Sequence, residues 1–354
     1  MQNKKKNLKF SEAINDALHM MMKKKKKVIV LGLGTEDPKR VFGTTSGLLE
    51  KFGTDRVFDI PTSESAITGI TLGASINGLR PVLSHQRVEF SLLSLEQIIN
   101  QISKWSFMNN GRKSVPLVIR LIIGKGWGQG PQHSQSLENI FAHIPGLKVV
   151  APSNPEDAKG LLISSIEDNN PVIFFEHRWL HEIKDKVPLK YYKKKIGEPT
   201  VRIVGKVITL VSYSYMLMET LKAANILKKH NIMCEVIDLS TLRPLNLKKI
   251  VTSIKKTKKF LFIDNGYSEF GIGSEVVSKL FNIMSNKKGY KIDKMGLPSY
   301  PIPSTRKLAA LCYPTYKDIV IKVLKIIKSK KKINIKEKEI MESDIPNLNF
   351  NGPF

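Results

Sequence analysis

Glu64 occupies a position at which a carboxylate could do chemistry. It follows the apolar stretch Val57–Ile60, which predicts a strand, and Pro61, which ends that strand. A helix is predicted over Ser63–Leu79, so Glu64 lies in its first turn. Ligands in open α/β folds bind where strands end and helices begin, which makes Glu64 a candidate site residue. Spacing alone favours a structural role, because an acidic residue in a first turn complements the helix dipole.

His133 is the second candidate for chemistry. It lies in the loop Gly124–Ser136, whose first seven residues include four glycines that allow the backbone to approach a ligand closely. Histidine is the side chain best suited to proton transfer near neutral pH. A solvent-exposed loop histidine without a function fits the sequence as well.

Other motifs argue against several kinds of site. Gly32–Gly34 follows a predicted strand as a dinucleotide-binding fingerprint would, but Asp37 stands where the third glycine is required. The sequence has no GxSxG motif, so a serine hydrolase is not indicated. Cys234 and Cys312 are far apart and lack paired ligands, so no zinc site is predicted.

The elements that position these residues alternate between strand and helix, which indicates an α/β fold of two layered domains. Strands are expected at Val28–Gly34, Val57–Ile60, Arg80–His85 and Val115–Gly124. A second α/β series begins near residue 201, after a polar, Lys-rich segment. We therefore expect a first domain over 1–183, a linker over 184–200, a second domain over 201–330 and a polar tail over 331–354.

The N-terminal segment predicts a helix of its own. Phe10, Ile14, Ala17 and Leu18 fall on one helical face, and Ser11 is the expected N-cap. The segment has no apolar signal core, and no apolar run in the chain reaches the roughly 18–20 residues that span a bilayer. A cytoplasmic protein without a membrane partner is expected.

The charge of the chain is the main argument for a different class of function. The 354 residues include 57 Lys+Arg and 31 Asp+Glu, a formal net charge of +26, which could suit a basic nucleic-acid-binding module. The lysine runs, such as Lys23–Lys27, lack the interleaved arginine and aromatic residues typical of such modules. We therefore interpret the lysines as a solvated surface and nucleic acid as an unlikely partner.

Long ordered stretches of the sequence resemble a known family. They include VFDIPTSESAITGITLGASINGLRPV, GPQHSQSLENIFAHIPGLKVVAPSNPEDAKGL, EVIDLSTLRPLN and FIDNGYSEFGIGSEV. Together they resemble the beta subunit of thiamine-diphosphate-dependent 2-oxo acid dehydrogenases, the type found in pyruvate, branched-chain 2-oxo acid and acetoin dehydrogenases. The resemblance covers roughly residues 7–330. It implies a pyrimidine-binding domain followed by a transketolase C-terminal-like domain.

The resemblance implies roles for three side chains. Glu64, in the PTSE motif, would contact a ring nitrogen of the cofactor's aminopyrimidine and act as a positioned acid. Phe90 would pack against that ring, although a core phenylalanine at a strand end fits too. His133 would bind substrate and pass the acyl group to a lipoyl domain.

The resemblance also implies partners and ions. The sequence contains no Gly-Asp-Gly motif, so Mg²⁺ and the cofactor's pyrophosphate are expected on an alpha subunit, in an α2β2 heterotetramer. A lipoyl-bearing acyltransferase core is a further expected partner. Family members hold potassium through backbone carbonyls that correspond to those of Leu117, Ser165, Ile166, Asp168 and Asn170.

Departures from the family pattern leave the substrate open. Arg87 stands where many members carry an aromatic residue, and it could alter the substrate pocket or pair with Glu89 or a partner chain. Ser240 stands where arginine is common, and the roles of the Trp127 loop and the tail are not indicated. The nearest alternative function is a subunit of another split thiamine-diphosphate enzyme, such as a two-chain transketolase.

Overall fold

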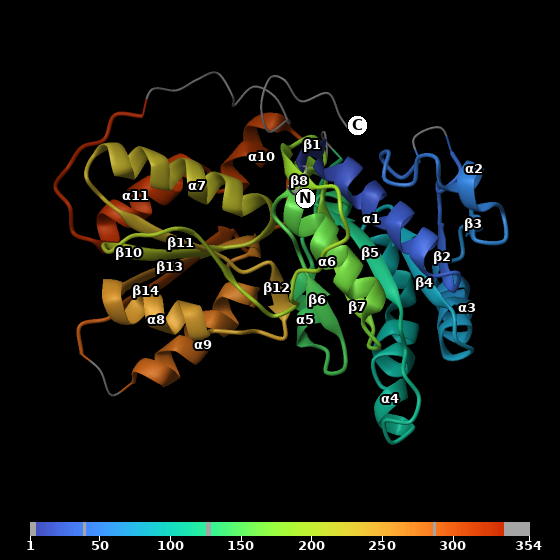
Figure 1. Ribbon diagram of the computed structural model, residues 1–354. Coiled ribbons are helices and arrows are strands. Elements are labelled where there is room, and N and C mark those ends of the chain that lie inside the picture. The colour runs from blue at the N-terminus through green and yellow to red at the C-terminus, as the bar shows by residue number, and fades with distance from the viewer. Residues whose placement is uncertain (1–4, 38–39, 125–128, 286–287, 336–354) are drawn as a thin grey trace. The chain divides into compact units, whose positions relative to one another are not determined.

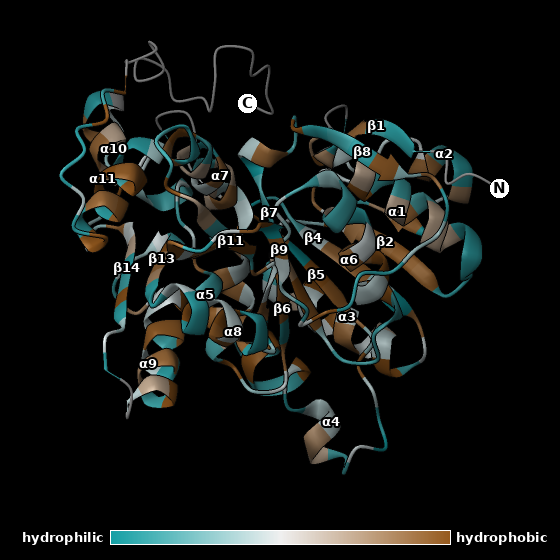
Figure 2. Cartoon of the chain, turned by 60° about the vertical axis from the view of Figure 1, so that its left-hand side comes forward, coloured by the Kyte–Doolittle hydropathy of each residue, from teal (hydrophilic) through white to brown (hydrophobic). Residues whose placement is uncertain are grey.

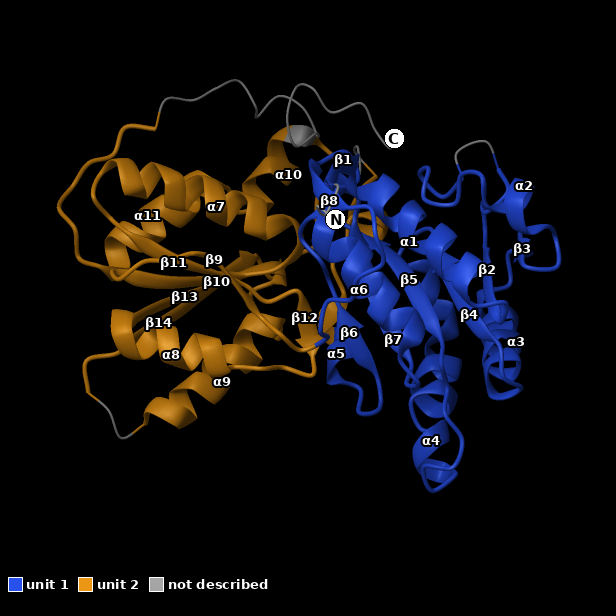
Figure 3. Cartoon of the chain, viewed as in Figure 1, with its two compact units in different colours: residues 1–124, 140–196, 351–354 blue, residues 125–139, 197–350 orange. Residues whose placement is uncertain are grey.

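The computed structural model describes residues 5–37, 40–124, 129–285 and 288–335. These residues form helices and strands in the alternating order that the sequence predicts (Figure 1). The chain divides into two compact units, coloured separately in Figure 3. Unit 1 comprises residues 1–124, 140–196 and 351–354, and unit 2 comprises residues 125–139 and 197–350. The Trp127 loop and the tail from residue 336 lie outside the described residues.

Unit 1 is built on a parallel sheet. Its strands follow the order β6-β7-β5-β4-β2-β3, and every neighbouring pair among them is parallel. The strands of the unit are β1 Lys5–Lys9, β2 Val28–Gly32, β3 Val57–Phe58, β4 Arg80–His85, β5 Val118–Ile123, β6 Lys148–Val150, β7 Val172–His177 and β8 Lys184–Pro188. Its helices are α1 Phe10–Lys24, α2 Leu48–Phe52, α3 Glu64–Ile76, α4 Trp105–Met108 and α6 Pro155–Glu167, and α5 Glu138–His143 begins at the boundary with unit 2.

Buried apolar strands form the core of this unit. All six residues of β5 and of β7 are buried, as expected for strands covered on both faces, and Figure 2 shows the apolar colour along β5 and β2. One face packs against α3, where Ile67 joins Ile29, Leu31 and Leu83 in a single apolar cluster. Because side chains alternate along a strand, residue 85 of β4 lies on the same face as Leu83.

The N-terminal helix forms as predicted, with one difference at its start. Phe10, Ile14, Ala17 and Leu18 are all buried. The prediction that Ser11 is the N-cap is wrong, because the helix already begins at Phe10. The Ser11 hydroxyl instead donates to the carbonyl of His181 at 3.2 Å, and the Glu12 carboxylate accepts from the backbone N–H of Lys9 at 2.8 Å.

The segment after β4 has an irregular helical path. It forms a short 3₁₀ turn, η1 Phe90–Ser94, a π-helical stretch, η2 Gln97–Ile102, and the short helix α4. Single-turn π segments are common near functional sites. Here the irregular path begins at Phe90, one of the predicted site residues.

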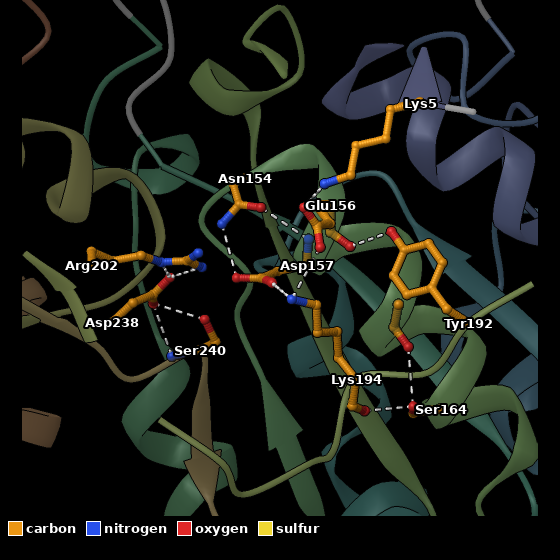
Figure 4. Close-up of polar contacts among 11 residues, drawn as sticks. Lys5, Asn154, Glu156, Asp157, Ser164, Tyr192, Lys194, Arg202, Asp238 and Ser240 are labelled. Carbon is orange, nitrogen blue, oxygen red and sulfur yellow. Dashed lines mark hydrogen bonds and ion pairs between the residues drawn. The ribbon is translucent and has the colours of Figure 1, made fainter. Parts of the chain in front are cut away.

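The expected linker contains ordered structure that belongs to unit 1. Its first residues form β8, which pairs antiparallel with β1. The residues after β8 lie along α6, where Lys194 contacts the carboxylates of Glu156 and Asp157 at 3.3 and 3.2 Å (Figure 4). The Tyr192 hydroxyl donates to the carbonyl of Glu156. Gly160 is needed for this approach, because a Cβ there would lie 2.5 Å from Cγ of Lys194.

Unit 2 contains a five-stranded sheet in the order β14-β13-β10-β11-β9, in which only β9 runs antiparallel to its neighbour. Within this unit, α7 and α11 cover one face of the sheet, and α8 and α9 cover the other (Figure 1). The strands are β9 Thr200–Ile203, β10 Ile208–Ser212, β11 Cys234–Asp238, β12 Thr241–Arg243, β13 Lys259–Tyr267 and β14 Lys291–Leu297. The helices are α7 Ser214–Lys229, α8 Lys248–Thr257, α9 Ile272–Met284, α10 Arg306–Cys312 and α11 Tyr316–Ile326.

Ser240, which departs from the family pattern, has a clear contact in unit 2. Its hydroxyl donates to the buried carboxylate of Asp238 at 2.7 Å (Figure 4). The guanidinium of Arg202, on β9, donates to the other oxygen of the same carboxylate at 2.8 and 3.2 Å. Asp238 is therefore neutralised from β9 rather than from position 240.

Among the described residues, no helix is both long enough and apolar enough to cross a membrane.

A buried ion pair joins the central strands of unit 1. Arg120 on β5 donates to both oxygens of Glu176 on β7, at 2.6 and 2.9 Å, and both side chains are almost fully buried. The guanidinium also donates to the hydroxyls of Ser84 on β4, at 3.1 Å, and Thr44, at 2.8 Å. Burial alone raises the pKa of a carboxyl, but the charge of Arg120 lowers the pKa of Glu176 to about 2, helped by His181. Glu176 is therefore ionised at all ordinary pH values.

We expect Glu176→Gln to lower the free energy of unfolding of the full chain by about 3 kcal/mol or more, because it leaves the Arg120 charge buried without a counter-charge. Urea denaturation at pH 7 measures this. Glu275→Gln is the matched control, since Glu275 pairs with Lys279 on the exposed surface of α9 and should change stability little. A loss below about 1 kcal/mol for Glu176→Gln would contradict the central role of the pair.

Candidate functional site

A pocket in unit 1 contains two of the predicted site residues. Glu64 and Phe90 both line it, and both are half-buried. The pocket lies where β2, β3 and β4 end, which is the edge of a parallel sheet at which ligands bind. Its lining residues are Leu33, Ile60, Pro61, Thr62, Glu64, His85, Gln86 and Phe90. The lining thus combines four apolar residues with four polar ones, and apolar walls with placed polar groups are typical of small-molecule sites.

The chain places Glu64 by ending β3 and starting α3 within a few residues. The backbone N–H of Ser63 donates to the carbonyl of Pro61 at 2.8 Å, which turns the chain, and α3 begins at Glu64. The Ser63 side chain makes no capping hydrogen bond. The Glu64 carboxylate therefore stands in the first turn, where the helix dipole favours a negative charge.

The glycines at residues 32–34 support the pocket from the next loop. The Gln86 side chain donates to the carbonyl of Leu33 at 3.0 Å, and the N–H of Gly34 donates to Asp59 at 2.9 Å. Gly34 has a φ of 78°, and a Cβ there would lie 2.3 Å from Nε2 of Gln86. The positive φ favours glycine at this position, and the missing Cβ leaves room for the Gln86 amide that joins the loops after β2 and β4.

His85 is a pocket residue that the sequence did not single out. It is the last residue of β4, it lines the same pocket as Glu64 and Phe90, and it is 4% exposed. Its Nε2 is buried and makes no hydrogen bond within the part of the chain that the structure describes. The only sequence signal was a histidine at the carboxyl end of a predicted parallel strand.

His133 lies in unit 2, whereas Glu64 lies in unit 1. His133 ends the 3₁₀ turn η3 Pro131–His133 and is half-buried. The residues after it are fixed by the C-terminal part of unit 2. Asn265 donates to the Ser136 hydroxyl at 3.2 Å and to the Glu138 carboxylate at 2.9 Å, and the Tyr313 hydroxyl donates to the carbonyl of Ser134 at 3.4 Å.

Glu138 is unusual among these contacts because it is a buried acid. It is 1% exposed, and burial raises its pKa to about 7. The neighbouring carboxylate of Asp264 acts in the same direction, and the hydrogen bond from Asn265 opposes it. Near neutral pH this carboxyl therefore holds a proton for a large fraction of the time.

Several of the carbonyls expected to hold potassium already accept hydrogen bonds from protein donors. Arg80 donates from one guanidinium nitrogen to the carbonyls of Ile166, at 2.9 Å, and Asp168, at 3.0 Å. The carbonyl of Leu117 accepts from the N–H of Val172 at 2.9 Å. Each carbonyl keeps a second lone pair, so potassium binding at these positions stays a prediction. Among the described residues, no cluster of three or more His, Cys, Asp or Glu side chains could hold a metal ion.

Arg87 lies within electrostatic reach of charged neighbours in unit 1. Burial lowers the pKa of Arg87, while Glu89 opposes the shift. Burial also lowers the pKa of Arg178 to about 9, and the charge of Arg87 adds to that effect while Glu89 again opposes it. A pairing of Arg87 with Glu89, one of the expected alternatives, stays a prediction.

Comparison with known proteins places this architecture in a family. Residues 6–182 match the family model described as "Transketolase, pyrimidine binding domain", and residues 199–319 match "Transketolase, C-terminal domain". The chain is 41% identical to the pyruvate dehydrogenase E1 component subunit beta of Staphylococcus epidermidis over 76% of this chain and 83% of that one. It belongs to the family of transketolase-like dehydrogenase beta subunits.

Other relatives in this beta-subunit family cover more of the chain. The acetoin:2,6-dichlorophenolindophenol oxidoreductase subunit beta of Cupriavidus necator is 36% identical over 90% of this chain and 97% of its own length. The Rickettsia felis pyruvate dehydrogenase E1 component subunit beta is 34% identical over 89% of this chain and 97% of its own. A solved structure titled "Split gene transketolase, inactive beta4 tetramer" matches with a TM-score of 0.74 over 92% of this chain and 99% of that one. At 20% identity, that likeness shows the fold alone.

We expect Glu138 to make the stability of the chain depend on pH. Its raised pKa means that the folded protein keeps a proton between about pH 4.5 and 7 that the unfolded chain has lost. The contribution of Glu138 to the free energy of unfolding is therefore fully present below about pH 4.5 and is lost as the pH rises through about 7. The loss is at most about 3 kcal/mol. Urea denaturation between pH 5 and 8 measures the change.

Glu138→Gln provides the comparison, because glutamine keeps the oxygen that accepts from Asn265 but carries no ionisable proton. The variant should show a smaller loss of stability between pH 5 and 8 than the unsubstituted chain. If the two denaturation profiles run parallel, Glu138 does not titrate in this window.

Proposed function

We propose that this chain is the beta subunit of a thiamine-diphosphate-dependent 2-oxo acid dehydrogenase, which decarboxylates a 2-oxo acid and transfers the acyl group to a lipoyl domain. The observation that carries the proposal is the shared pocket of Glu64 and Phe90 in a chain of this beta-subunit family. A cytoplasmic location is part of the same proposal.

The pocket suits the aminopyrimidine half of the cofactor. A flat heteroaromatic ring needs apolar walls, which Leu33, Ile60 and Phe90 provide, and a few polar groups at its edge, which include Glu64. When bound, thiamine diphosphate supplies the nucleophilic carbon and the electron sink that decarboxylation of a 2-oxo acid requires. Phe90 would pack on the ring, and Glu64 would hydrogen-bond one of its ring nitrogens.

The position of Glu64 suits an acid that shares a proton with the ring. Its carboxylate stands at a helix N-terminus and is half-buried, so its charge is only partly screened by water. A carboxyl group held there can donate a proton to a ring nitrogen and take it back in each cycle. General acid–base groups of this kind typically contribute 10²- to 10⁴-fold to a rate.

The remaining parts of the site would come from partners. We propose that an alpha subunit supplies Mg²⁺ and the pyrophosphate site within an α2β2 heterotetramer, and that a lipoyl-bearing acyltransferase core receives the acyl group. The sequence supports the first point, because it lacks the Gly-Asp-Gly motif that usually accompanies pyrophosphate binding. His133 would contact substrate and assist acyl transfer, and potassium would bind the carbonyls near Asp168 and Asn170.

The first test is Glu64→Gln in the complex formed by co-expression with an alpha-type chain. We expect turnover, measured as ferricyanide reduction with pyruvate, branched 2-oxo acids or acetoin, to fall at least 100-fold. Glu275→Gln is the matched control, because Glu275 is also a first-turn carboxylate, on α9, and lies on the exposed surface. Turnover should be unchanged in that variant.

Normal turnover by the Glu64→Gln complex would contradict the mechanism. Activity of the unsubstituted complex with sugar phosphates but not with 2-oxo acids would instead favour a two-chain transketolase. Full activity of the chain without an alpha subunit would contradict the shared site.

His133→Gln separates the two half-reactions. If His133 assists acyl transfer, this variant should lose reductive acylation of a free lipoyl domain by at least tenfold more than it loses ferricyanide reduction. Both rates are measured on one preparation of the complex. Equal losses in the two assays would assign His133 to substrate binding alone, and no loss in either would remove it from the site.

A further inference from the structure

The pocket proposed for the aminopyrimidine, the pyrimidine pocket, is lined by a residue with a buried polar atom that the proposed contacts of Glu64 and Phe90 do not use. Nε2 of His85 is buried and has no hydrogen-bond partner among the described residues. His85 lines the pocket together with Glu64, Gln86 and Phe90. Buried polar groups in folded proteins nearly always have a partner, so an exception beside a pocket calls for an explanation.

The neighbouring residues offer few hydrogen-bond partners to the side chain of His85. On β4, the preceding residue Ser84 faces the opposite side of the sheet and accepts from Arg120. On the face of His85, Leu83 belongs to the apolar cluster beneath α3, and the pocket residues Leu33 and Ile60 offer no side-chain hydrogen bond. Gln86 uses its side-chain amide to donate to the carbonyl of Leu33.

The imidazole is also held in one charge state. Burial lowers the pKa of His85 to about 4, so the ring is neutral near pH 7. A neutral imidazole offers one N–H donor and one nitrogen acceptor, and it can therefore pair with either kind of polar atom on a ligand. A neutral ring next to a heteroaromatic ligand avoids the cost of burying an unpaired charge.

We propose that His85 is a second polar contact of the pyrimidine pocket, and that its Nε2 hydrogen-bonds the polar edge of the bound aminopyrimidine. This inference rests on the proposed function, because it takes thiamine diphosphate as the ligand. Glu64 would hold one ring nitrogen and His85 another polar atom of the same ring. The two contacts together would fix the rotation of the ring in its plane, which a single hydrogen bond and an apolar wall do not.

The test is the affinity of the alpha–beta complex for thiamine diphosphate with Mg²⁺, measured by isothermal titration calorimetry. His85→Phe keeps a planar ring of similar size and removes both nitrogens. We expect Kd to rise about tenfold, since a buried ligand group loses its hydrogen-bond partner. His85→Gln keeps a donor and an acceptor and should raise Kd by no more than about threefold. The thermal midpoints of the free complexes report whether each variant is folded.

The matched controls are His143→Phe and His143→Gln, because His143 is exposed on α5 and outside the pocket. Both should bind the cofactor as the unsubstituted complex does. The inference is overturned if His85→Phe binds with unchanged Kd. It is also overturned if His85→Gln is as weak as His85→Phe, which would assign the effect to packing.

The same titrations separate this inference from the proposed function. If the unsubstituted complex does not bind thiamine diphosphate, both fail together. If the unsubstituted complex binds and Glu64→Gln binds more weakly, while His85→Phe binds normally, only the role of His85 is wrong.

Discussion

The site of unit 1 depends on a charge that has no access to water. Arg120 lies in the middle of the parallel sheet, and its guanidinium is satisfied only if β4, β5, β7 and the loop at Thr44 keep their relative positions. An unpaired charge at this depth costs several kcal/mol, so the register of these strands is strongly specified. Ser84, one of its partners, immediately precedes His85 and Gln86. The ion pair that fixes the strands therefore also fixes the backbone beside His85 and Gln86, which line the pocket.

The three candidate side chains are divided between the two units, although all of them lie in the first 140 residues of the sequence. Glu64 and Phe90 belong to the strand ends of unit 1, whereas the His133 segment belongs to unit 2 through Asn265 and Tyr313. Substitutions in the C-terminal part of the chain can therefore alter a residue that lies within the matched pyrimidine-binding region of the sequence. The candidate residues all lie in the first matched region, whereas Asn265 and Tyr313, which contact the segment after His133, lie in the second.

The sequence predicted the parts of this structure that rest on local patterns. Apolar runs ended by glycine or proline located the strands around Glu64, and the four apolar positions of α1 were all buried. Contacts between distant segments were not predictable in this way. Nothing local indicates that β1 pairs with β8, that Arg202 neutralises Asp238, or that Arg80 reaches the carbonyls of Ile166 and Asp168. His85 was missed because its burial beside the pocket, which only the folded chain shows, makes it a candidate, whereas its residue type does not.

The pairing of β1 with β8 has a consequence for synthesis of the chain. Lys5 pairs with Pro188, so β1 has no partner until about 180 more residues have been made. At typical rates of 5–20 residues per second, the ribosome needs about 10–40 s for that length. During that interval β1 is an open strand edge, the kind of surface on which nascent chains aggregate. Its sequence, KKNLK, has three lysines in five residues, and like charges on an edge strand repel a second copy. The lysines of β1 thus oppose its pairing with a second copy before β8 has been made.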